Sequence, residues 1–371
     1  MKRSLRLLIC GFIAMGCFSL CSKSYAQEEI TIDSAEAVKK FQWKAFIDAY
    51  YSYDFTAPVN HEKASFIYNH KRHNEFSINL AMLGGAYDDG SVRANLSMMA
   101  GNYPQYNLDA EPQLFRSIFE ANIGVRISRK KALWLDAGIM PSHIGFETAI
   151  NPDNWTLSRS ILAENSPYYE AGLRLSYNSV NGKWYMAALL LNGWQRVRRV
   201  DGNNTPAFGS QITFSPAGKI SFNWSTFIGN DKPDSARLWR YFNNIFAKWM
   251  LTENIGIILG LDHGLEQKTK NSSKLNSWYS PMIIVHYKLS KWSIAGRAEI
   301  YKDKNGVIVS LINEEPFEMQ SYSLNVDRQI GKNLLWRTEG RIFKNSSAYF
   351  VKENSLVRSN QHITSSLSIR F

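Results

Sequence analysis

Cysteine is almost absent from this sequence, and its few positions are informative. The 371 residues include three cysteines, Cys10, Cys17 and Cys21, and all three lie within the first 26 residues. The rest of the chain can therefore form no disulfide, although the export predicted below would place it where disulfides persist. Its stability must have another source, and a closed ladder of backbone hydrogen bonds is one candidate.

Long apolar runs are also missing. After residue 26, no run approaches the roughly 18 residues that a transmembrane helix needs. Aromatic residues make up 13% of the chain and its mean hydropathy is −0.29. Such a chain is too polar for a helical membrane protein and rich in aromatics for a soluble one, which favours a membrane β-barrel.

Motifs that carry enzyme chemistry are absent as well. The sequence has no phosphate-binding glycine loop, no Cys-x-x-Cys site and no Gly-x-Ser-x-Gly, and its seven histidines are scattered without paired metal-ligand spacing. We therefore expect no catalytic residue, no metal and no cofactor. An outer-membrane enzyme using serine or aspartate with histidine remains the least favoured alternative.

The first 26 residues have the pattern of a secretory signal peptide. Lys2, Arg3 and Arg6 precede an apolar run over 7–20, and a small-x-small cleavage site ends at Ala26. The run of about 14 residues is too short to remain as a membrane helix. A lipid-modified Cys21 is disfavoured because the preceding Leu20 is bulkier than the small residue usual there.

The predicted organisation has three parts: a signal peptide over 1–26, a periplasmic N-terminal segment over 27–42 with one short helical turn, and an outer-membrane β-barrel over 43–371. The signal peptide carries four basic residues and no acid, so the net charge of +11 falls to +7 after its removal. An excess of positive charge can indicate nucleic acid. Export makes lipopolysaccharide and anionic solutes the expected counterparts, and no nucleic acid.

From Trp43 onward the residues alternate between apolar and polar with period 2. In 75–85, for example, Phe76, Ile78, Leu80 and Met82 are expected to face outward. Sixteen such strands are joined by seven short turns. They alternate with eight longer polar segments, at about 57–73, 104–114, 142–167, 195–206, 231–236, 267–276, 303–318 and 345–359.

This alternation of short and long connections is typical of an outer-membrane barrel, with short periplasmic turns and longer extracellular loops. The sequence therefore predicts an all-β fold, a transmembrane up-and-down antiparallel barrel of about sixteen strands. Fourteen or eighteen strands remain compatible with the pattern.

The last strand, Gln361 to Phe371, resembles the closing strand of bacterial outer-membrane barrels, whose terminal aromatic residue is read by the assembly machinery. We expect it to pair with Trp43 to Phe55, so that the sheet has no open edge. Its Arg370 would then face the lumen.

Charged residues share the parity opposite to the apolar face. On the lipid side a midplane arginine or lysine would cost about 2–4 kcal/mol, so these side chains are expected inside. The predicted pore-lining residues are Arg126, Arg174, Arg297, Glu299, Arg337, Glu339 and Arg341. The alternative is that they form a paired charge ladder that stiffens the wall.

Five short stretches carry a resemblance to a known family. They are Tyr50 to Asp54 (YYSYD), Gly138 to Glu147 (GIMPSHIGFE), Asn151-Pro152, Trp155-x-x-Ser-Arg-Ser160 and Pro167 to Gly172 (PYYEAG). With the barrel pattern, the chain resembles the outer-membrane β-barrel porins described as OmpL-like. The resemblance implies a pore-forming protein and brings no catalytic residue.

The longest loop, 142–167, is the third long one, and in general porins that loop folds inward. We expect it to lie inside the barrel and to form the pore constriction with Glu147, Asp153, Arg159 and Glu164. Glu147 and the Ser158-Arg159-Ser160 triplet match the family's pattern. A loop that packs over the mouth is the alternative.

The predicted function is a porin in the outer membrane of a Gram-negative bacterium. It would form a water-filled channel for passive diffusion of small hydrophilic solutes, with a mild preference for anions or acidic sugars. The expected partners are outer-membrane lipid and lipopolysaccharide, the barrel assembly machinery at Phe371, and the solutes; homo-oligomerisation is left open. A binding or adhesion barrel with a blocked lumen is the alternative function.

Overall fold

The computed structural model describes residues 40–371. The predicted signal peptide and almost all of the predicted segment 27–42 lie outside the described residues. Among the described residues, no helix has the length and apolarity needed to cross a bilayer.

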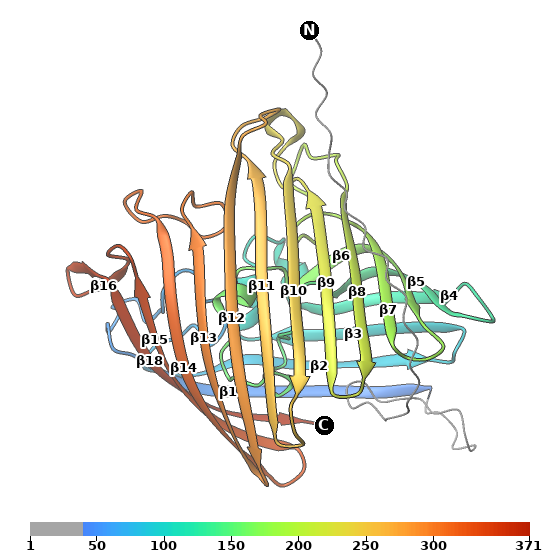
Figure 1. Ribbon diagram of the computed structural model, residues 1–371, viewed down its shortest axis with the longest axis horizontal. Helices are drawn as coiled ribbons and strands as arrows, with labels where there is room; N and C mark the ends of the chain where they lie inside the picture. Colours follow the sequence, from blue (N-terminus) through green and yellow to red (C-terminus); the bar gives the residue numbers. More distant parts are fainter. Residues whose placement is uncertain (1–39) are drawn as a thin grey trace.

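Sixteen antiparallel strands form one closed barrel, as the sequence predicts (Figure 1). They are β1 (Phe41–Asp54), β2 (Phe76–Asp88), β3 (Val92–Ala100), β4 (Ile118–Arg126), β5 (Ala132–Pro141), β6 (Tyr169–Asn178), β7 (Trp184–Leu191), β8 (Ala207–Ala217), β9 (Ile220–Gly229), β10 (Arg240–Met250), β11 (Ile255–Gln267), β12 (Leu275–Leu289), β13 (Trp292–Asp303), β14 (Phe317–Ile330), β15 (Leu334–Asn345) and β18 (Ser359–Arg370). Each strand pairs with its neighbours in sequence order.

The remaining elements are small and lie in the long connections. The last long loop holds the hairpin of β16 (Phe350–Lys352) and β17 (Ser355–Val357). The helices are α1 (Asn102–Asn107) and α2 (Ile161–Glu164), with 3₁₀ turns η1 (Gln113–Ser117), η2 (Asn151–Asp153) and η3 (Asp234–Ala236). We call the barrel end with the short connections the turn end and the other the loop end.

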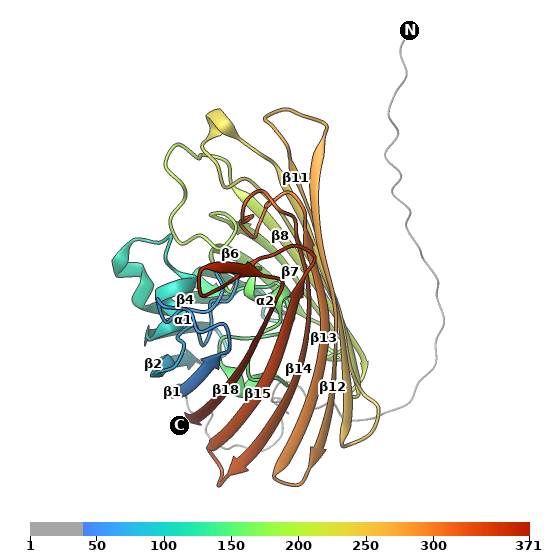
Figure 2. The same ribbon diagram turned by 90° about the vertical axis from the view of Figure 1, so that its left-hand side faces the viewer.

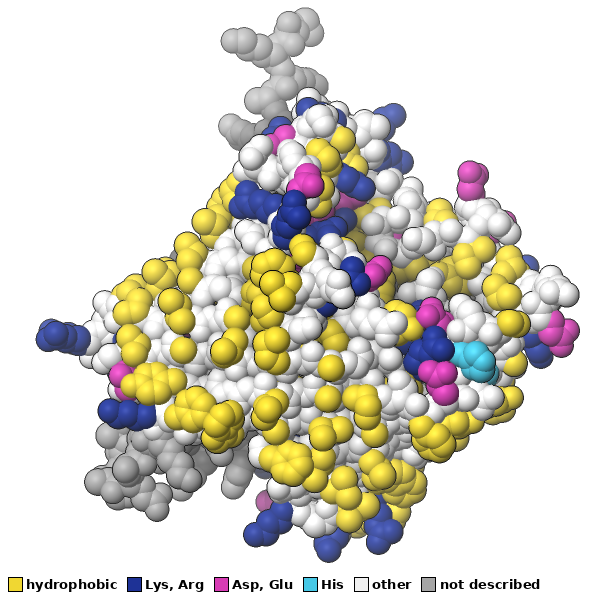
Figure 3. Space-filling model, turned by 180° about the vertical axis from the view of Figure 1, so that it is seen from behind, with side chains coloured by type: hydrophobic (Ala, Val, Ile, Leu, Met, Phe, Trp, Pro, Cys, Tyr) yellow, Lys and Arg dark blue, Asp and Glu magenta, His cyan; other side chains and the backbone are white. Residues whose placement is uncertain are grey.

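The wall follows the alternation of the sequence. Large apolar side chains at every second position are exposed on the outside, as Leu259 and Leu261 are on β11. Charged side chains gather toward the two rims and leave a largely uncharged band between them (Figure 3). This is the surface that a barrel presents to lipid.

A β-bulge corrects the prediction for β2. Phe76 and Ile78 face outward as expected, but the register with β1 shifts between Asp48 and Ala49. The extra residue reverses the parity that follows, since a bulge places two residues opposite one. Leu80 and Met82, predicted on the lipid face, are therefore buried inside the barrel.

Closure occurs between the first and last strands, as predicted. The register runs from Phe46 opposite Arg370 to Asp54 opposite His362. The backbone N–H of Phe371 adds a hydrogen bond of 3.0 Å to the carbonyl oxygen of Ala45. Neither β1 nor β18 is left with an open edge.

The wall is uneven in strand length. β11, β12 and β14 have 13, 15 and 14 residues, whereas β3 and β4 have nine each. The tall strands stand at the front of Figure 1, and β1 to β5 cross behind them at a steep angle. Figure 2 shows connections from the loop end, α2 among them, inside the curve of the wall.

Removing Phe371 should impair closure of the barrel. The deletion removes the hydrogen bond to Ala45 and an aromatic side chain at the turn-end rim. We expect a lower yield of heat-modifiable, folded protein on gel electrophoresis after expression. The control is Phe371→Tyr in the full-length chain, which keeps the aromatic ring and the backbone hydrogen bond and should fold with the wild-type yield. Equal yields of the deletion variant and the wild type would contradict this role of Phe371.

Candidate functional site

The third long loop, L3 (142–168), lies across the interior and is bonded to the far wall. The backbone N–H groups of Leu157, Ser158 and Ile161 donate to side chains of β14, β15 and β13 respectively. The acceptors are the amide oxygen of Asn325 at 3.0 Å, the carboxylate of Glu339 at 2.5 Å and that of Glu299 at 2.6 Å. L3 thus divides the space inside the barrel.

Four of the predicted pore-lining residues form one buried charge network beneath L3. Arg297 contacts Glu339 at 2.8 Å and Glu299 at 3.2 Å, and Arg341 contacts Glu299 at 2.5 Å. All four side chains are at most 1% exposed. These residues do face inward, but they hold L3 in place and do not line open water.

Both arginines also bond L3 directly. Arg297 donates to the hydroxyl of Thr156 at 3.0 Å and the carbonyl of Ser158 at 2.8 Å. Arg341 donates to the carbonyl of Arg159 at 2.7 Å. An arginine has five N–H donors, so each can satisfy a carboxylate and a loop carbonyl at once.

Arg337 anchors a second part of L3. Its guanidinium forms a two-point contact with Asp327, at 2.8 and 2.9 Å, and donates to the backbone carbonyls of Asn151 and Asn154. The side chain is completely buried.

The two remaining predicted lining residues lie nearer the turn end. Arg174 and Arg93 share Asp136, at 3.3 and 2.6 Å, and about a quarter of each arginine side chain is exposed. Arg126 is exposed at the turn end of β4 and contacts the carbonyl of Lys131 at 3.4 Å. The structure does not bring these residues together with the network below L3.

The four predicted constriction residues divide into two pairs. Glu147 and Glu164 hold loops: Glu147 accepts from the backbone N–H and hydroxyl of Ser160, and Glu164 accepts from the backbone N–H of Tyr68 at 2.9 Å. Burial raises the pKa of Glu147, while the charges of Arg297 and Arg159 act in the opposite direction.

Asp153 and Arg159 line a cavity that Glu147 also lines, whereas Glu164 lines a different one. Asp153 pairs with Arg370 at 2.8 Å, and both side chains are nearly half exposed. Arg159 is buried, with its guanidinium 3.5 Å from the ring centre of Tyr168 and its Nη2 donating to the Glu147 carbonyl at 2.8 Å.

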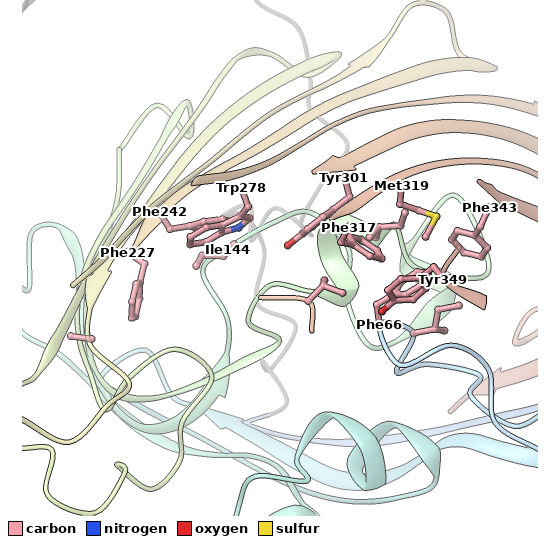
Figure 4. Packing of buried hydrophobic residues seen from close by; sticks show 14 of the residues in the cluster. Phe66, Ile144, Phe227, Phe242, Trp278, Tyr301, Phe317, Met319, Phe343 and Tyr349 are labelled. Carbon is pink, nitrogen blue, oxygen red and sulfur yellow. The ribbon is translucent and has the colours of Figure 1, made fainter. Parts of the chain in front are cut away.

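An aromatic cluster fills another part of the interior, toward the loop end (Figure 4). Its aromatic barrel members occupy inward positions on β9, β10 and β12 to β15, and Phe66 from the first long loop, L1 (55–75), packs among those of β14 and β15. The labelled wall residues include Phe242, Trp278, Tyr301, Phe317 and Phe343. The cluster was not predicted from the sequence, because the inward positions were assigned to polar residues. The signal was present as aromatic residues at inward positions near the loop ends of these strands.

L1 also inserts a lysine into the interior. Lys63 is only 3% exposed, and its Nζ donates to the hydroxyl of Ser52 at 3.1 Å. Burial lowers the pKa of Lys63 to about 7, although the charges of Asp54 and Glu164 oppose that shift.

Several cavities remain around these loops, and three of them lie beside L3 or at the turn end. The L3 cavity, of about 630 Å³, lies between L3 and the wall of β1, β2 and β4, and extends to Arg370 and Phe371 at the turn end. The loop-end cavity, of about 370 Å³, includes Glu164 and Arg240. Tyr169 lines both of these cavities.

The third cavity is the turn-end vestibule, of about 580 Å³, at the turn end of β6 to β10. Five basic side chains line it and no acidic one does: Arg93, Arg174, Lys183, Lys219 and Lys248. Asp136 neutralises part of the charge of the two arginines. Within residues 40–371 the three lysines have no carboxylate at ion-pair distance; Lys248 lies 5.0 Å from the ring centre of Trp155.

A buried histidine–carboxylate pair at the start of L3 is the arrangement that most resembles part of an enzyme site. His143 Nδ1 lies 2.7 Å from Glu170, and desolvation is outweighed by this carboxylate, so the pKa of His143 is raised. Its Nε2 is bonded to the carbonyl of Thr226 at 2.8 Å, and the nearby Ser142 hydroxyl bonds Glu170 rather than the histidine. The imidazole therefore does not activate this serine. Among the described residues, no three metal-binding side chains form a cluster.

Comparison with known proteins agrees with the barrel architecture. Residues 40–371 match the family described as "Putative beta-barrel porin-2, OmpL-like". No curated protein matches the sequence.

Similar solved structures include an anion-selective porin from Comamonas acidovorans, with a TM-score of 0.58 and 9% identity over 89% of this chain and 99% of that one. The outer membrane channel DcaP of Acinetobacter baumannii has a TM-score of 0.58 and 11% identity, over 89% and 97%. The trimer form of OmpT of Vibrio cholerae has 0.57 and 8%, over 89% and 99%. At these identities the likeness concerns the fold.

Replacing Glu339 with Gln should release L3. Removing one partner of a buried ion pair leaves the other charge uncompensated and typically costs about 3–5 kcal/mol. An added cysteine at Ala163, which is 3% exposed in α2, reports the loop's position. We expect maleimide to label this thiol at least tenfold faster in the Glu339→Gln background.

The matched control is Asp201→Asn, which removes an exposed ion pair with Arg198 and should leave labelling slow. The native cysteines all belong to the predicted signal peptide and would not interfere. Equal labelling rates with Glu and Gln at 339 would show that the network does not hold L3.

Lys63 should make the stability depend on pH. Its pKa is about 7 in the fold and about 10.5 when unfolded, so the fold binds this proton less tightly. Above about pH 10.5 Lys63 is neutral in both states and does not lower the stability of the fold. As the pH falls from 10.5 to about 7, the unfolded chain binds the proton and the fold does not, so the free energy of unfolding decreases. The melting temperature of Lys63→Met should therefore exceed that of the wild type by an amount that increases as the pH is lowered from 10.5 to 7. A gain that stays constant with pH, as expected for the exposed control Lys130→Met, would refute this.

Proposed function

The chain belongs to the family of OmpL-like β-barrel porins, and on this premise we propose that it is a porin of the Gram-negative outer membrane. It would admit small hydrophilic solutes by passive diffusion and would favour anions mildly. The observation that carries the anion preference is the turn-end vestibule, where Lys183, Lys219 and Lys248 have no acidic partner among the described residues. A cavity lined by one sign of charge raises the local concentration of the opposite ion.

The charged wall residues around L3 support the same conclusion, because they are paired and neutralise one another. The four members of the network below L3 neutralise one another, and Arg337 is neutralised by Asp327. Because paired, buried charges exert little field on a passing ion, the unpaired lysines dominate. The selectivity is mild because the other two cavities have both acidic and basic lining residues.

We assign the constriction to the L3 segment that separates the L3 cavity from the loop-end cavity. Arg159 lines the first cavity, Glu164 the second, and Tyr169 both. In this assignment Asp153 lies at the turn-end entrance, and Glu147 lines the L3 cavity while it accepts hydrogen bonds from Ser160. A solute would pass along Tyr169.

A binding barrel with a closed lumen is the second candidate. The aromatic cluster around Phe66 favours it, because tightly packed rings from L1 and the wall leave no polar path on that side. In that case the long loops would contact ligands or other cells and the protein would not conduct.

Planar bilayers separate the two candidates. A porin should give ohmic conductance steps, with a reversal potential in a KCl gradient that indicates preference for chloride. Replacing Lys183, Lys219 and Lys248 with Gln should move the reversal potential toward zero, or to the cation side. Silent bilayers would favour the binding barrel.

A control with the same charge change comes from the turn between β4 and β5. Changing Arg129, Lys130 and Lys131 to Gln removes three exposed positive charges that do not line the vestibule. This variant should keep the wild-type selectivity. If both triple variants shift the reversal potential equally, only overall charge matters and the vestibule assignment fails.

A further inference from the structure

The L3 cavity has an unusual lining, because aromatic rings surround a few charged groups. Its aromatic members come from β1, α1, the start of β4, L3 and the chain end, and include Trp43, Phe46, Tyr103, Phe119, Tyr168 and Phe371. The volume of about 630 Å³ falls within the range of about 300–1,000 Å³ usual for small-molecule sites. Apolar walls of this kind suit an organic body better than a hydrated ion or a sugar.

Two of its three basic side chains are already neutralised. Lys44 contacts Glu120 at 3.0 Å, and Arg370 contacts Asp153 at 2.8 Å. The third, Arg159, has no carboxylate at ion-pair distance within residues 40–371. The lining also includes Glu147, but its carboxylate is engaged by Ser160 and by Arg297 at 3.7 Å. Arg159 is therefore the one basic side chain of this cavity without a carboxylate partner among the described residues.

Arg159 also lacks hydrogen-bond acceptors. It is 5% exposed, and its Nε and Nη1 have no partner among the described residues, although Nη2 donates to the carbonyl of Glu147. Burying a cationic donor without an acceptor costs free energy, so binding of a ligand that supplies acceptors is favoured. The face of Tyr168 covers the guanidinium at 3.5 Å, so a ligand would reach these nitrogens by shifting that ring.

We propose that the L3 cavity binds a small monocarboxylate with a ring-bearing apolar body, its carboxylate accepting hydrogen bonds from Arg159. The ring packs among the aromatic walls, and the single charge matches the single free cation. The entrance lies at the turn end, beside Trp43, Arg370 and Phe371. Multiply charged anions such as phosphate are expected to prefer the turn-end vestibule, with its three free lysines.

This inference adds a solute class to the proposed channel, and it rests on that proposal only for its physiological meaning. Binding in solution does not require conduction. A failure to bind and a failure to conduct are therefore separate results.

The test is isothermal titration of the purified protein in detergent micelles with benzoate, with empty micelles as the blank. Benzoate should bind saturably at one site. Benzyl alcohol lacks the charge and acetate lacks the ring, and each should bind at least tenfold more weakly, since a hydrogen bond to a charged group contributes about 1.5–3 kcal/mol. Equal affinities for benzoate and benzyl alcohol, or for benzoate and acetate, would overturn the proposal without any variant.

Arg159→Gln should weaken benzoate binding about tenfold or more and leave the weak binding of benzyl alcohol unchanged. Arg159→Lys keeps the charge and should recover part of the affinity. The control is Arg198→Gln, an exposed arginine of the connection between β7 and β8 that pairs with Asp201. Undiminished benzoate binding by a folded Arg159→Gln protein would exclude this site.

Discussion

The interior of this barrel depends on the pairing of buried charges across β13 and β15. Arg297, Glu299, Glu339 and Arg341 stand on the inner wall, where water would solvate them in an open pore. L3 covers them, so their desolvation has to be offset by mutual contacts and by hydrogen bonds to the loop. The loop and the wall are consequently interdependent: the network is satisfied only with L3 inside, and it holds L3 there together with the hydrogen bonds of Arg337 and Asn325.

This dependence separates two kinds of charge that look alike in the sequence. The charged residues below L3 neutralise one another and hold L3 against the wall. Nearer the turn end, Lys183, Lys219 and Lys248 have no carboxylate partner among the described residues and remain able to attract anions. Arg159 lies between these kinds, because it belongs to L3 yet has two nitrogens without acceptors. Selectivity is therefore expected to follow from the few free cations and not from the total charge of the wall.

Aromatic packing restricts the interior in a different way. Phe66 from L1 meets inward rings such as Phe317 and Phe343, whose burial inside the barrel is favourable because it removes apolar surface from water. On this side the barrel has a conventional hydrophobic core. The two larger of the three cavities lie toward β1 to β4 and toward the turn end, and the smaller loop-end cavity lies between the long loops.

The sequence alone determined the barrel. Period-2 alternation assigns lipid-facing residues, and the alternation of turns and loops predicts about sixteen strands. The pairing of β18 with β1 follows because every backbone group in a membrane wall must find a partner in a neighbouring strand. The same alternation also identified inward-facing charged residues, namely Arg297, Glu299, Arg337, Glu339 and Arg341. Only the tertiary structure decided what these residues contact. Parity fixes the side of the wall on which a side chain lies, but which loop reaches it is set by long-range contacts, such as that between Ser158 and Glu339, which no local pattern encodes. The bulge that turns Leu80 inward and the ring cluster around Phe66 escaped the sequence for the same reason: both depend on residues brought together by closure of the barrel.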